Sequence, residues 1–165
     1  MKKPVNTIAP DAKIGRNVRI WNYAYVGSKT VVGDNVKIGS LAHVDYDVKI
    51  GNDTKIEGCA YIPPMSRIGK NVFIGPAAVL TNDPYPPSKR MIGVTIEDGA
   101  VIGARAVIKA GVKIGKGAVV AMGAVVTKNV PSGKVVMGVP ARVVYTRKEF
   151  DLKMKMWESG SCALT

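Results

Sequence analysis

The fold of this chain is constrained most by the six-residue spacing of its large aliphatic side chains, which runs without interruption from position 8 to position 80. A second, mostly small residue follows each of them four positions later. Neither the 3.6-residue period of a helix nor the simple alternation of a strand produces this pattern. The large series is Ile8, Ile14, Ile20, Val26, Val32, Ile38, Val44, Ile50, Ile56, Ile62, Ile68, Ile74 and Leu80, and the small series is Ala12, Val18, Ala24, Thr30, Val36, Ala42, Val48, Thr54, Ala60, Ser66, Val72 and Ala78.

This spacing predicts that both series point inward from short extended segments, with a corner between one hexad and the next. Glycine follows many of the large residues, as at Gly15, Gly39 and Gly75, where the chain must bend sharply and a side chain is a burden. Strands this short cannot pair with themselves, so each must pair with the next turn of a coil. We therefore predict a parallel β-solenoid whose coils lie about 4.8 Å apart.

The repeat breaks once, at the segment "TNDPYPPSKRMIG". A second series with the same spacing follows it, from Ile96 to Val126, and is displaced in phase by four residues. The simplest interpretation is that residues of about 81–94 form a loop extruded from a coil that continues beneath it. Three prolines, at positions 84, 86 and 87, restrict the conformations open to this loop.

A chain of 165 residues is long enough for one domain with a core of its own. We expect residues 1–145 to form the β-helix domain and residues 146–165 to form a C-terminal helix and tail. In the tail, Phe150, Met154 and Trp157 lie on one helical stripe. Such a helix would cover the open end of the solenoid or a neighbouring subunit.

Composition narrows the cellular setting and the class of partner. The formal charge of +12 favours anionic partners, but the basic residues form no arm and no nucleic-acid motif, so we expect no nucleic acid. No segment has the length and apolarity of a signal peptide or a membrane span, which predicts a cytoplasmic protein without membrane insertion. Two cysteines, Cys59 and Cys162, cannot form a disulfide framework and fit a reducing compartment.

The hexads, together with the segments "FIGPAAVLTNDPYPPS" and "GAVVTKNVPSGKVVMGVPARVV", resemble the hexapeptide-repeat acyltransferases. The resemblance implies an all-β fold, a left-handed parallel β-helix with three hexads per coil, since the period alone does not reveal the hand. The chain is most similar to the acetyl-CoA-dependent N-acetyltransferases that act on 3-amino groups of nucleotide-linked sugars. This likeness implies acetyl-CoA as co-substrate, a sugar nucleotide as acceptor and a homotrimer with coenzyme A in the groove between subunits.

The loop motif of those enzymes reads like Phe-Thr-Asn-Asp followed by a Tyr-Pro pair. Leu80 stands here in place of the aromatic residue, and the remaining matches are Thr81, Asn82, Asp83, Tyr85 and Pro86. Active-site histidines in an H-x-C-x-I-G-D-like setting are not matched.

Acyl transfer from a thioester passes through an oxyanion, which hydrogen-bond donors stabilise. We expect Asn82 to supply such a donor and Asp83 to hold the amine or the sugar, while Tyr85, Lys89 and Arg90 bind the anionic substrate. The alternative is that the Asn-Asp pair only forms a turn before proline.

His43 is the one histidine of the chain and therefore a natural general-base candidate. Its hexad phase points it outward, and at 18-residue spacing it lies between Tyr25 and Tyr61. This group is either a substrate-facing site or a packed ladder of rings. Cys59 also points outward, but no base is visibly beside it, so we expect it to be inert.

A groove for coenzyme A needs small outward residues. Positions 104, 122 and 140 superpose at the 18-residue period, and the expected cofactor-binding residues are Gly103, Ala104, Met122, Gly123, Gly138 and Pro140. Arg142, and also Arg147, would meet the phosphates, although each of these charges is equally compatible with a solvated surface.

Proteins with this repeat also have three functions other than N-acetyl transfer. A zinc carbonic anhydrase of this fold needs three histidine ligands, and the chain has one histidine, so we expect no metal. An O-acetyltransferase acting on a sugar or serine hydroxyl would need His43 as its base. A non-catalytic assembly or binding subunit would carry the same repeat. The sequence leaves open the acceptor sugar and the length of the acyl chain.

Overall fold

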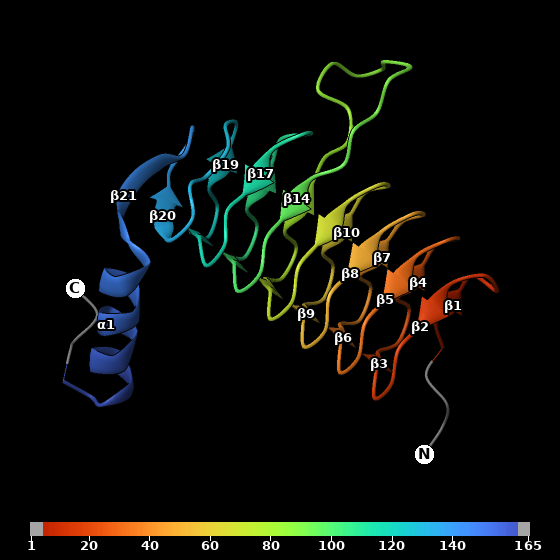
Figure 1. Ribbon diagram of the computed structural model, residues 1–165, viewed down its shortest axis with the longest axis horizontal. Helices are drawn as coiled ribbons and strands as arrows, with labels where there is room; N and C mark the ends of the chain where they lie inside the picture. The colour runs from red at the N-terminus through yellow and green to blue at the C-terminus, as the bar shows by residue number, and fades with distance from the viewer. Residues whose placement is uncertain (1–4, 162–165) are drawn as a thin grey trace.

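The computed structural model describes residues 5–161, and it shows a three-sided coil of short parallel strands that ends in one helix (Figure 1). Each strand of two residues pairs with the strand one coil away, so three sheets form the three faces of a prism. The predicted left-handed β-helix of hexapeptide repeats, with an inserted loop and a short C-terminal helix, is confirmed as the fold class.

The strands are divided among three faces, which we number in chain order. Face 1 contains β1 (Thr7–Ile8), β4 (Tyr25–Val26), β7 (His43–Val44), β10 (Tyr61–Ile62), β13 (Val79–Leu80), β16 (Val107–Ile108) and β19 (Val125–Val126). Face 2 contains β2 (Lys13–Ile14), β5 (Val31–Val32), β8 (Lys49–Ile50), β11 (Arg67–Ile68), β14 (Thr95–Ile96) and β17 (Lys113–Ile114). Face 3 contains β3 (Arg19–Ile20), β6 (Lys37–Ile38), β9 (Lys55–Ile56), β12 (Phe73–Ile74), β15 (Val101–Ile102), β18 (Val119–Val120), β20 (Lys134–Met137) and β21 (Arg142–Thr146).

Most coils repeat at a sequence separation of 18, which is also the separation of the hydrogen-bonded side chains of Asn17 and Asn35. The exception in the middle is the coil that carries the loop, where Val79 pairs with Val107 instead of a residue one ordinary coil away. The ten extra residues leave the coil at the corner between faces 1 and 2 and rise from it as a loop (Figure 1). The interpretation of the sequence break as an insertion into a continuous coil is therefore confirmed.

The last coil is two residues shorter than an ordinary one, because Val120 pairs with Val136. The expected superposition of Met122 and Pro140 at the 18-residue period is therefore wrong, since the strands of face 3 pair here at a separation of 16 and the carbonyl of Gly138 accepts a hydrogen bond from the N–H of Val125. The two residues are missing from the corner before Val130, because Val126 pairs with Ile108 at the ordinary separation of 18 while Val130 bridges Ile114 at a separation of 16.

The expected helix in the tail is confirmed as α1 (Arg147–Glu158), which follows β21 directly. Thr146 and Glu149 form a capping box at its start. Arg147 fixes the helix to the coil, because its guanidinium donates to the carbonyls of Gly99 (3.0 Å) and Gly117 (3.2 Å) and pairs with Asp151 (2.7 Å). No residue of α1 is buried, so its apolar stripe does not close the described end of the coil.

The interior contains the two predicted series of aliphatic and small residues, buried almost completely from Ala24 to Val136. Glycine after the large residue is required because the coils approach closely at the corners. A Cβ on Gly75 would lie 2.6 Å from the nitrogen of Ala104, and a Cβ on Gly39 would lie 2.4 Å from the nitrogen of Gly58. The left-handed residue of each corner comes two positions later and is mostly not glycine, as at Asn17 (φ 56°).

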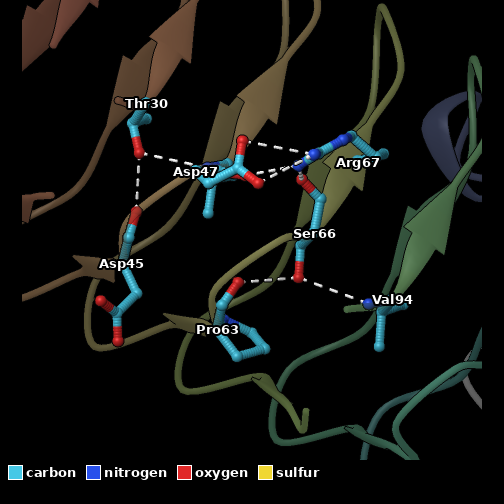
Figure 2. Close-up of polar contacts among 8 residues, drawn as sticks. Thr30, Asp45, Asp47, Pro63, Ser66, Arg67 and Val94 are labelled. Atoms are coloured by element: carbon cyan, nitrogen blue, oxygen red, sulfur yellow. Dashed lines mark hydrogen bonds and ion pairs between the residues drawn. The ribbon is translucent and has the colours of Figure 1, made fainter. Parts of the chain in front are cut away.

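Three hydroxyl-bearing residues, Thr30, Thr54 and Ser66, take the place of small aliphatic residues in the core. Each accepts a hydrogen bond from a backbone N–H of the following coil, which would otherwise be buried without a partner. Ser66 also donates to the carbonyl of Pro63 (2.9 Å) and accepts from the N–H of Val94 (3.4 Å), as Figure 2 shows. The hydroxyl of Ser66 therefore anchors the point at which the chain re-enters the coil after the loop.

Within residues 5–161, the single helix has 12 residues and is too short and too polar to cross a membrane. The thiol of Cys59 is free and exposed, while Cys162 lies outside the described residues.

Replacing Ser66 with alanine should destabilise the protein by about 1–3 kcal/mol, because the N–H of Val94 loses its partner while it stays buried. Thermal or urea unfolding measures the change. Ser132→Ala, at an exposed corner, is the matched control and should stay within about 0.5 kcal/mol of the parent. Equal stability of the two variants would show that Ser66 does not anchor the chain.

Candidate active site

The loop has a defined internal structure, although it contains no helix or strand. The carboxylate of Asp83 accepts hydrogen bonds from the N–H of Tyr85 (2.9 Å), the N–H of Ser88 (2.6 Å) and the hydroxyl of Ser88 (2.8 Å). At the base of the loop, the N–H of Ile92 donates to the carbonyl of Asn82 (2.8 Å). Asp83 is therefore the residue around which the loop is folded.

These hydrogen bonds, first among them the one from the backbone N–H of Ser88, hold the pKa of the Asp83 carboxyl below its ordinary value. Both carboxylate oxygens are engaged within the loop. The predicted contact of Asp83 with an amine or a sugar remains a prediction, and it would have to use the remaining lone pairs of these oxygens. The sequence signal for the structural role is an aspartate one residue before proline, which often accepts hydrogen bonds from the turn that follows.

Asn82 is half-buried at the base of the loop, and its side-chain amide nitrogen contacts the sulfur of Met91 at 3.2 Å. A thioether is a weak acceptor, so the amide is available to a stronger one. The ring of Tyr85 is 78% exposed, with the ammonium of Lys109 5.8 Å from its centroid. Lys89 and Arg90 are exposed as well, so three of the expected substrate-binding side chains face solvent around the tip of the loop.

On face 1, His43 lies in a ladder of rings, as its hexad phase predicts. Its imidazole stacks on Tyr25, with centroids 4.6 Å apart, and lies 5.4 Å from the ring centroid of Tyr61. The carboxylate of Asp45 is 3.7 Å from Nε2 of His43 and accepts a hydrogen bond from the hydroxyl of Tyr61 (3.4 Å). Burial, and next the charge of Asp45, raises the pKa of Tyr61.

Asp45 was not predicted from the sequence. The available signal was its place two residues after His43 at the end of a two-residue strand, where the chain turns the corner and brings the carboxylate back toward the ring. A carboxylate in this position can orient an imidazole.

His43 and Asn82 do not meet within one protomer. Tyr61 pairs with His43 on one side and with Val79 on the other, so the histidine lies two coils from the strand that leads into the loop. Two coils correspond to roughly 10 Å along the axis.

The expected cofactor residues from Gly103 to Gly123 lie along a different edge of the prism, between faces 3 and 1, whereas Arg142 lies in β21 and lines a hollow with Lys128 and Asn129. Ala104 and Gly123 are adjacent there, because the N–H of Gly123 donates to the carbonyl of Ala104 (2.9 Å). Met122 is 80% exposed, and Gly138, Pro140 and Arg142 are exposed too. The backbone of Met122 lies so close to Gly103 that a Cβ added to Gly103 would be 2.4 Å from the backbone nitrogen of Met122.

The two expected arginines differ in what they contact. Arg142 is exposed and donates only to the carbonyl of Ala141 (3.0 Å) among described residues, so its guanidinium can still receive an anion. Arg147 is engaged by Asp151 and by two corner carbonyls, and its guanidinium therefore serves the attachment of α1. Within residues 5–161, no three acidic, histidine or cysteine side chains are grouped in a way that would hold a metal ion.

Two family models match the chain. "Hexapeptide repeat of succinyl-transferase" matches residues 93–128, and "Bacterial transferase hexapeptide (six repeats)" matches residues 29–64. One match lies on each side of the loop, which agrees with a single coil interrupted by an insertion.

Among curated proteins, the chain is similar to a 2,3,4,5-tetrahydropyridine-2,6-dicarboxylate N-acetyltransferase of Staphylococcus carnosus, with 49% identity over 82 residues. This similarity covers 50% of the chain but 34% of that protein. The chain thus spans about a third of the length of the curated relatives it matches.

Among solved structures, a hexapeptide-repeat-containing acetyltransferase of Vibrio cholerae O1 biovar eltor, complexed with acetyl coenzyme A, superposes with a TM-score of 0.57. The identity is 29%, over 73% of this chain and 69% of the other. PerB of Caulobacter crescentus, in complex with CoA and GDP-perosamine, has a TM-score of 0.55 and 24% identity, over 86% of this chain and 55% of the other. The second likeness concerns the fold alone.

Replacing Asp83 with alanine should loosen the loop, since three hydrogen bonds to its carboxylate are lost. We expect trypsin to cleave after Lys89 and Arg90 roughly fivefold faster, as for the loss of about one net hydrogen bond. Asp98→Ala, which removes a corner carboxylate outside the loop, is the control and should leave this cleavage unchanged.

Loop order should also depend on pH. The folded pKa of Asp83 is depressed, so the carboxylate stabilises the folded loop above the unperturbed value of 3.8, and this contribution is lost as the pH falls through the lower folded value. The NMR shifts of the Tyr85 and Ser88 amides should therefore titrate below pH 3.8. A midpoint at or above that value would contradict the assignment.

Proposed function

We propose that this chain, which two hexapeptide-repeat models match on either side of the loop, is an acetyl-CoA-dependent N-acetyltransferase that acts on an amino group of a nucleotide-linked sugar. The observation that carries the proposal is the folded loop at the single break of the repeat, which presents Asn82 at its base and Tyr85, Lys89 and Arg90 near its tip. The core of the coil is aliphatic except for three buried hydroxyls that bond to backbone groups, so chemistry has to come from what departs from the repeat.

The similar proteins support the transferase part of this proposal. The Staphylococcus carnosus relative is named an N-acetyltransferase, and the Vibrio cholerae acetyltransferase was solved with acetyl coenzyme A. Support for a sugar nucleotide comes from the loop motif and from PerB, which has the same fold and was solved with CoA and GDP-perosamine. The +12 charge also favours two anionic substrates.

In the proposed reaction the neutral amine attacks the thioester carbonyl, forms the new C–N bond and moves negative charge to the carbonyl oxygen. The amide of Asn82 donates to that oxyanion. Collapse of the intermediate breaks the C–S bond and releases the coenzyme A thiolate, and the proton lost by the amine neutralises the thiolate directly or through solvent. Positioning the amine beside the thioester contributes more than a strong base would, since a neutral amine is already a good nucleophile.

A homotrimer is part of the proposal. Within one protomer the loop leaves the edge between faces 1 and 2, while the expected coenzyme A residues line the edge between faces 3 and 1. Three-fold packing of flat faces would place the loop of one protomer beside the cofactor edge of its neighbour. The residues would then complete one site from two chains.

A second candidate, an O-acetyltransferase, is favoured by one observation. Nε2 of His43 lies 3.7 Å from the carboxylate of Asp45, so a base with an orienting acid is present on face 1. A hydroxyl acceptor needs such a base, whereas an amine does not. A non-catalytic subunit is the third candidate, and titration of coenzyme A by calorimetry separates it from both enzymes.

Removal of residues 83–90, bridged by glycine, should abolish acetyl transfer while the melting temperature stays nearly the same, because the coil beneath continues in register. Asn82→Ala should lower turnover by about 10²–10³-fold if the amide is an oxyanion donor. The assay is thiol release from acetyl-CoA with a panel of amino-sugar nucleotides. An ordinary rate from the loop-deleted protein would place the active site elsewhere.

His43→Ala distinguishes the two acceptors. For an amine acceptor we expect a loss of turnover below about 100-fold, the low end of what general-base catalysis contributes. Coenzyme A affinity, measured in parallel by calorimetry, should not change. A loss of about 10⁴-fold with unchanged affinity, the upper end of general-base catalysis, would instead establish the hydroxyl reaction.

A further inference from the structure

Face 3 carries a row of basic side chains in its first three coils. Arg19 pairs in register with Lys37, and Lys37 pairs in register with Lys55, so three cationic side chains project outward at successive coils. Successive coils are about 4.8 Å apart, and like charges directly opposite each other on a sheet are destabilising. Repulsion within such a row lowers the stability of the folded protein unless a bound anion compensates the charges.

Most of this repulsion comes from two residues of the row, Arg19 and Lys37. Lys55 is compensated by Glu57, whose carboxylate is 2.5 Å from its ammonium. Elsewhere on the coil the basic residues Arg16, Arg67 and Lys113 each form an ion pair with an acidic side chain. Among the described residues, no acidic side chain lies within ion-pair distance of Arg19 or Lys37.

The surface is hollowed on both sides of this pair. A hollow of about 420 Å³ lies toward the edge between faces 3 and 1, and a second of about 480 Å³ lies on the opposite side, with Arg19 and Lys37 lining both. The first is also lined by Trp21, Ser40, the glycines of two corners and the ion pair of Lys55 with Glu57. Trp21 is 44% exposed, so part of its indole surface is open to a flat ligand.

We propose that this hollow binds a nucleoside diphosphate group. The guanidinium of Arg19 and the ammonium of Lys37 bind the diphosphate, the hydroxyl of Ser40 donates to an oxygen, and the base stacks on Trp21. Phosphate alone would need only the two cations. The exposed indole beside them favours an aromatic base attached to the same anion.

The position of the hollow deepens the proposed function, on which this assignment rests. Corner hydrogen bonds connect the coils along one edge of the prism, from the hollow to the expected cofactor residues. The backbone N–H groups of Cys59, Ala77, Arg105 and Gly123 donate to the carbonyls of Ser40, Gly58, Pro76 and Ala104, respectively. A sugar attached to a diphosphate held at Arg19 and Lys37 can therefore extend along this edge toward Ala104. The acceptor and the thioester would approach each other along one continuous edge.

The same chemistry has a second possible source, the 3′-phosphoadenosine diphosphate end of coenzyme A. Binding of UDP, dTDP and GDP, measured by calorimetry beside 3′,5′-ADP and inorganic pyrophosphate, distinguishes the two. The variants are Arg19→Glu/Lys37→Glu and Trp21→Ala. The control is Lys13→Glu/Lys49→Glu on face 2, which lowers the formal charge of +12 by the same 4.

We expect at least one of the nucleoside diphosphates to bind, and the Arg19→Glu/Lys37→Glu variant to lose about tenfold or more of its affinity. Trp21→Ala should weaken the same ligand roughly five- to hundredfold and leave pyrophosphate unchanged. The control should stay within about twofold of the parent, since long-range charge alone is a weak effect at ordinary salt.

Three results would overturn the proposal. The first is the absence of binding of any nucleoside diphosphate, and the second is an equal loss of affinity in the control variant. The third is a loss of affinity confined to 3′,5′-ADP, which would assign the hollow to coenzyme A. Failure of the proposed function is distinguishable from these. If nucleotide binding behaves as expected but no thiol is released, the hollow stands and the transferase proposal fails. If acetyl transfer proceeds equally well in the Arg19→Glu/Lys37→Glu variant, the transferase proposal stands and the assignment of the hollow fails.

Discussion

The close stacking of one coil on the next is the constraint on which the rest of the structure depends. Each strand from β1 to β19 has two residues, so its backbone groups find partners only in the neighbouring coils. This stacking demands glycine where a Cβ would lie within 3 Å of the next coil's backbone, as at Gly75, and hydroxyls where a buried N–H needs an acceptor, as at Ser66. It also aligns outward residues in rows, which creates both the ring ladder at His43 and the cationic row at Arg19.

The coil itself could be predicted from the sequence because every hexad repeats the same six-residue spacing of inward side chains. The inward residues, the loop between Leu80 and Ile96 and the neighbours of His43 all followed from counting. Counting failed at the last corner, where Val130, only four residues after Val126, takes the place of the next inward residue. The last coil is therefore two residues short, and Met122 and Pro140 are not in register.

The candidate site was harder to predict because its side chains act through contacts that no period encodes. The sequence identified Asp83 as a polar loop residue, but the three donors that surround its carboxylate depend on how the loop folds back on itself. Asp45 is brought to His43 by a corner, and Arg147 reaches carbonyls 48 and 30 residues away in the sequence. Such partners become visible only when the coil has been built.

The loop enters and leaves the coil at one corner, and the strands on either side pair as if the ten additional residues were not there. The prism thus supplies the free energy of folding. The loop supplies the chemistry of the outer surface, and its length and composition do not affect how the strands of the prism pair. Substitutions at the loop tip are then nearly neutral for folding and can accumulate independently. A chain built in this way can change what it recognises without first having to become more stable.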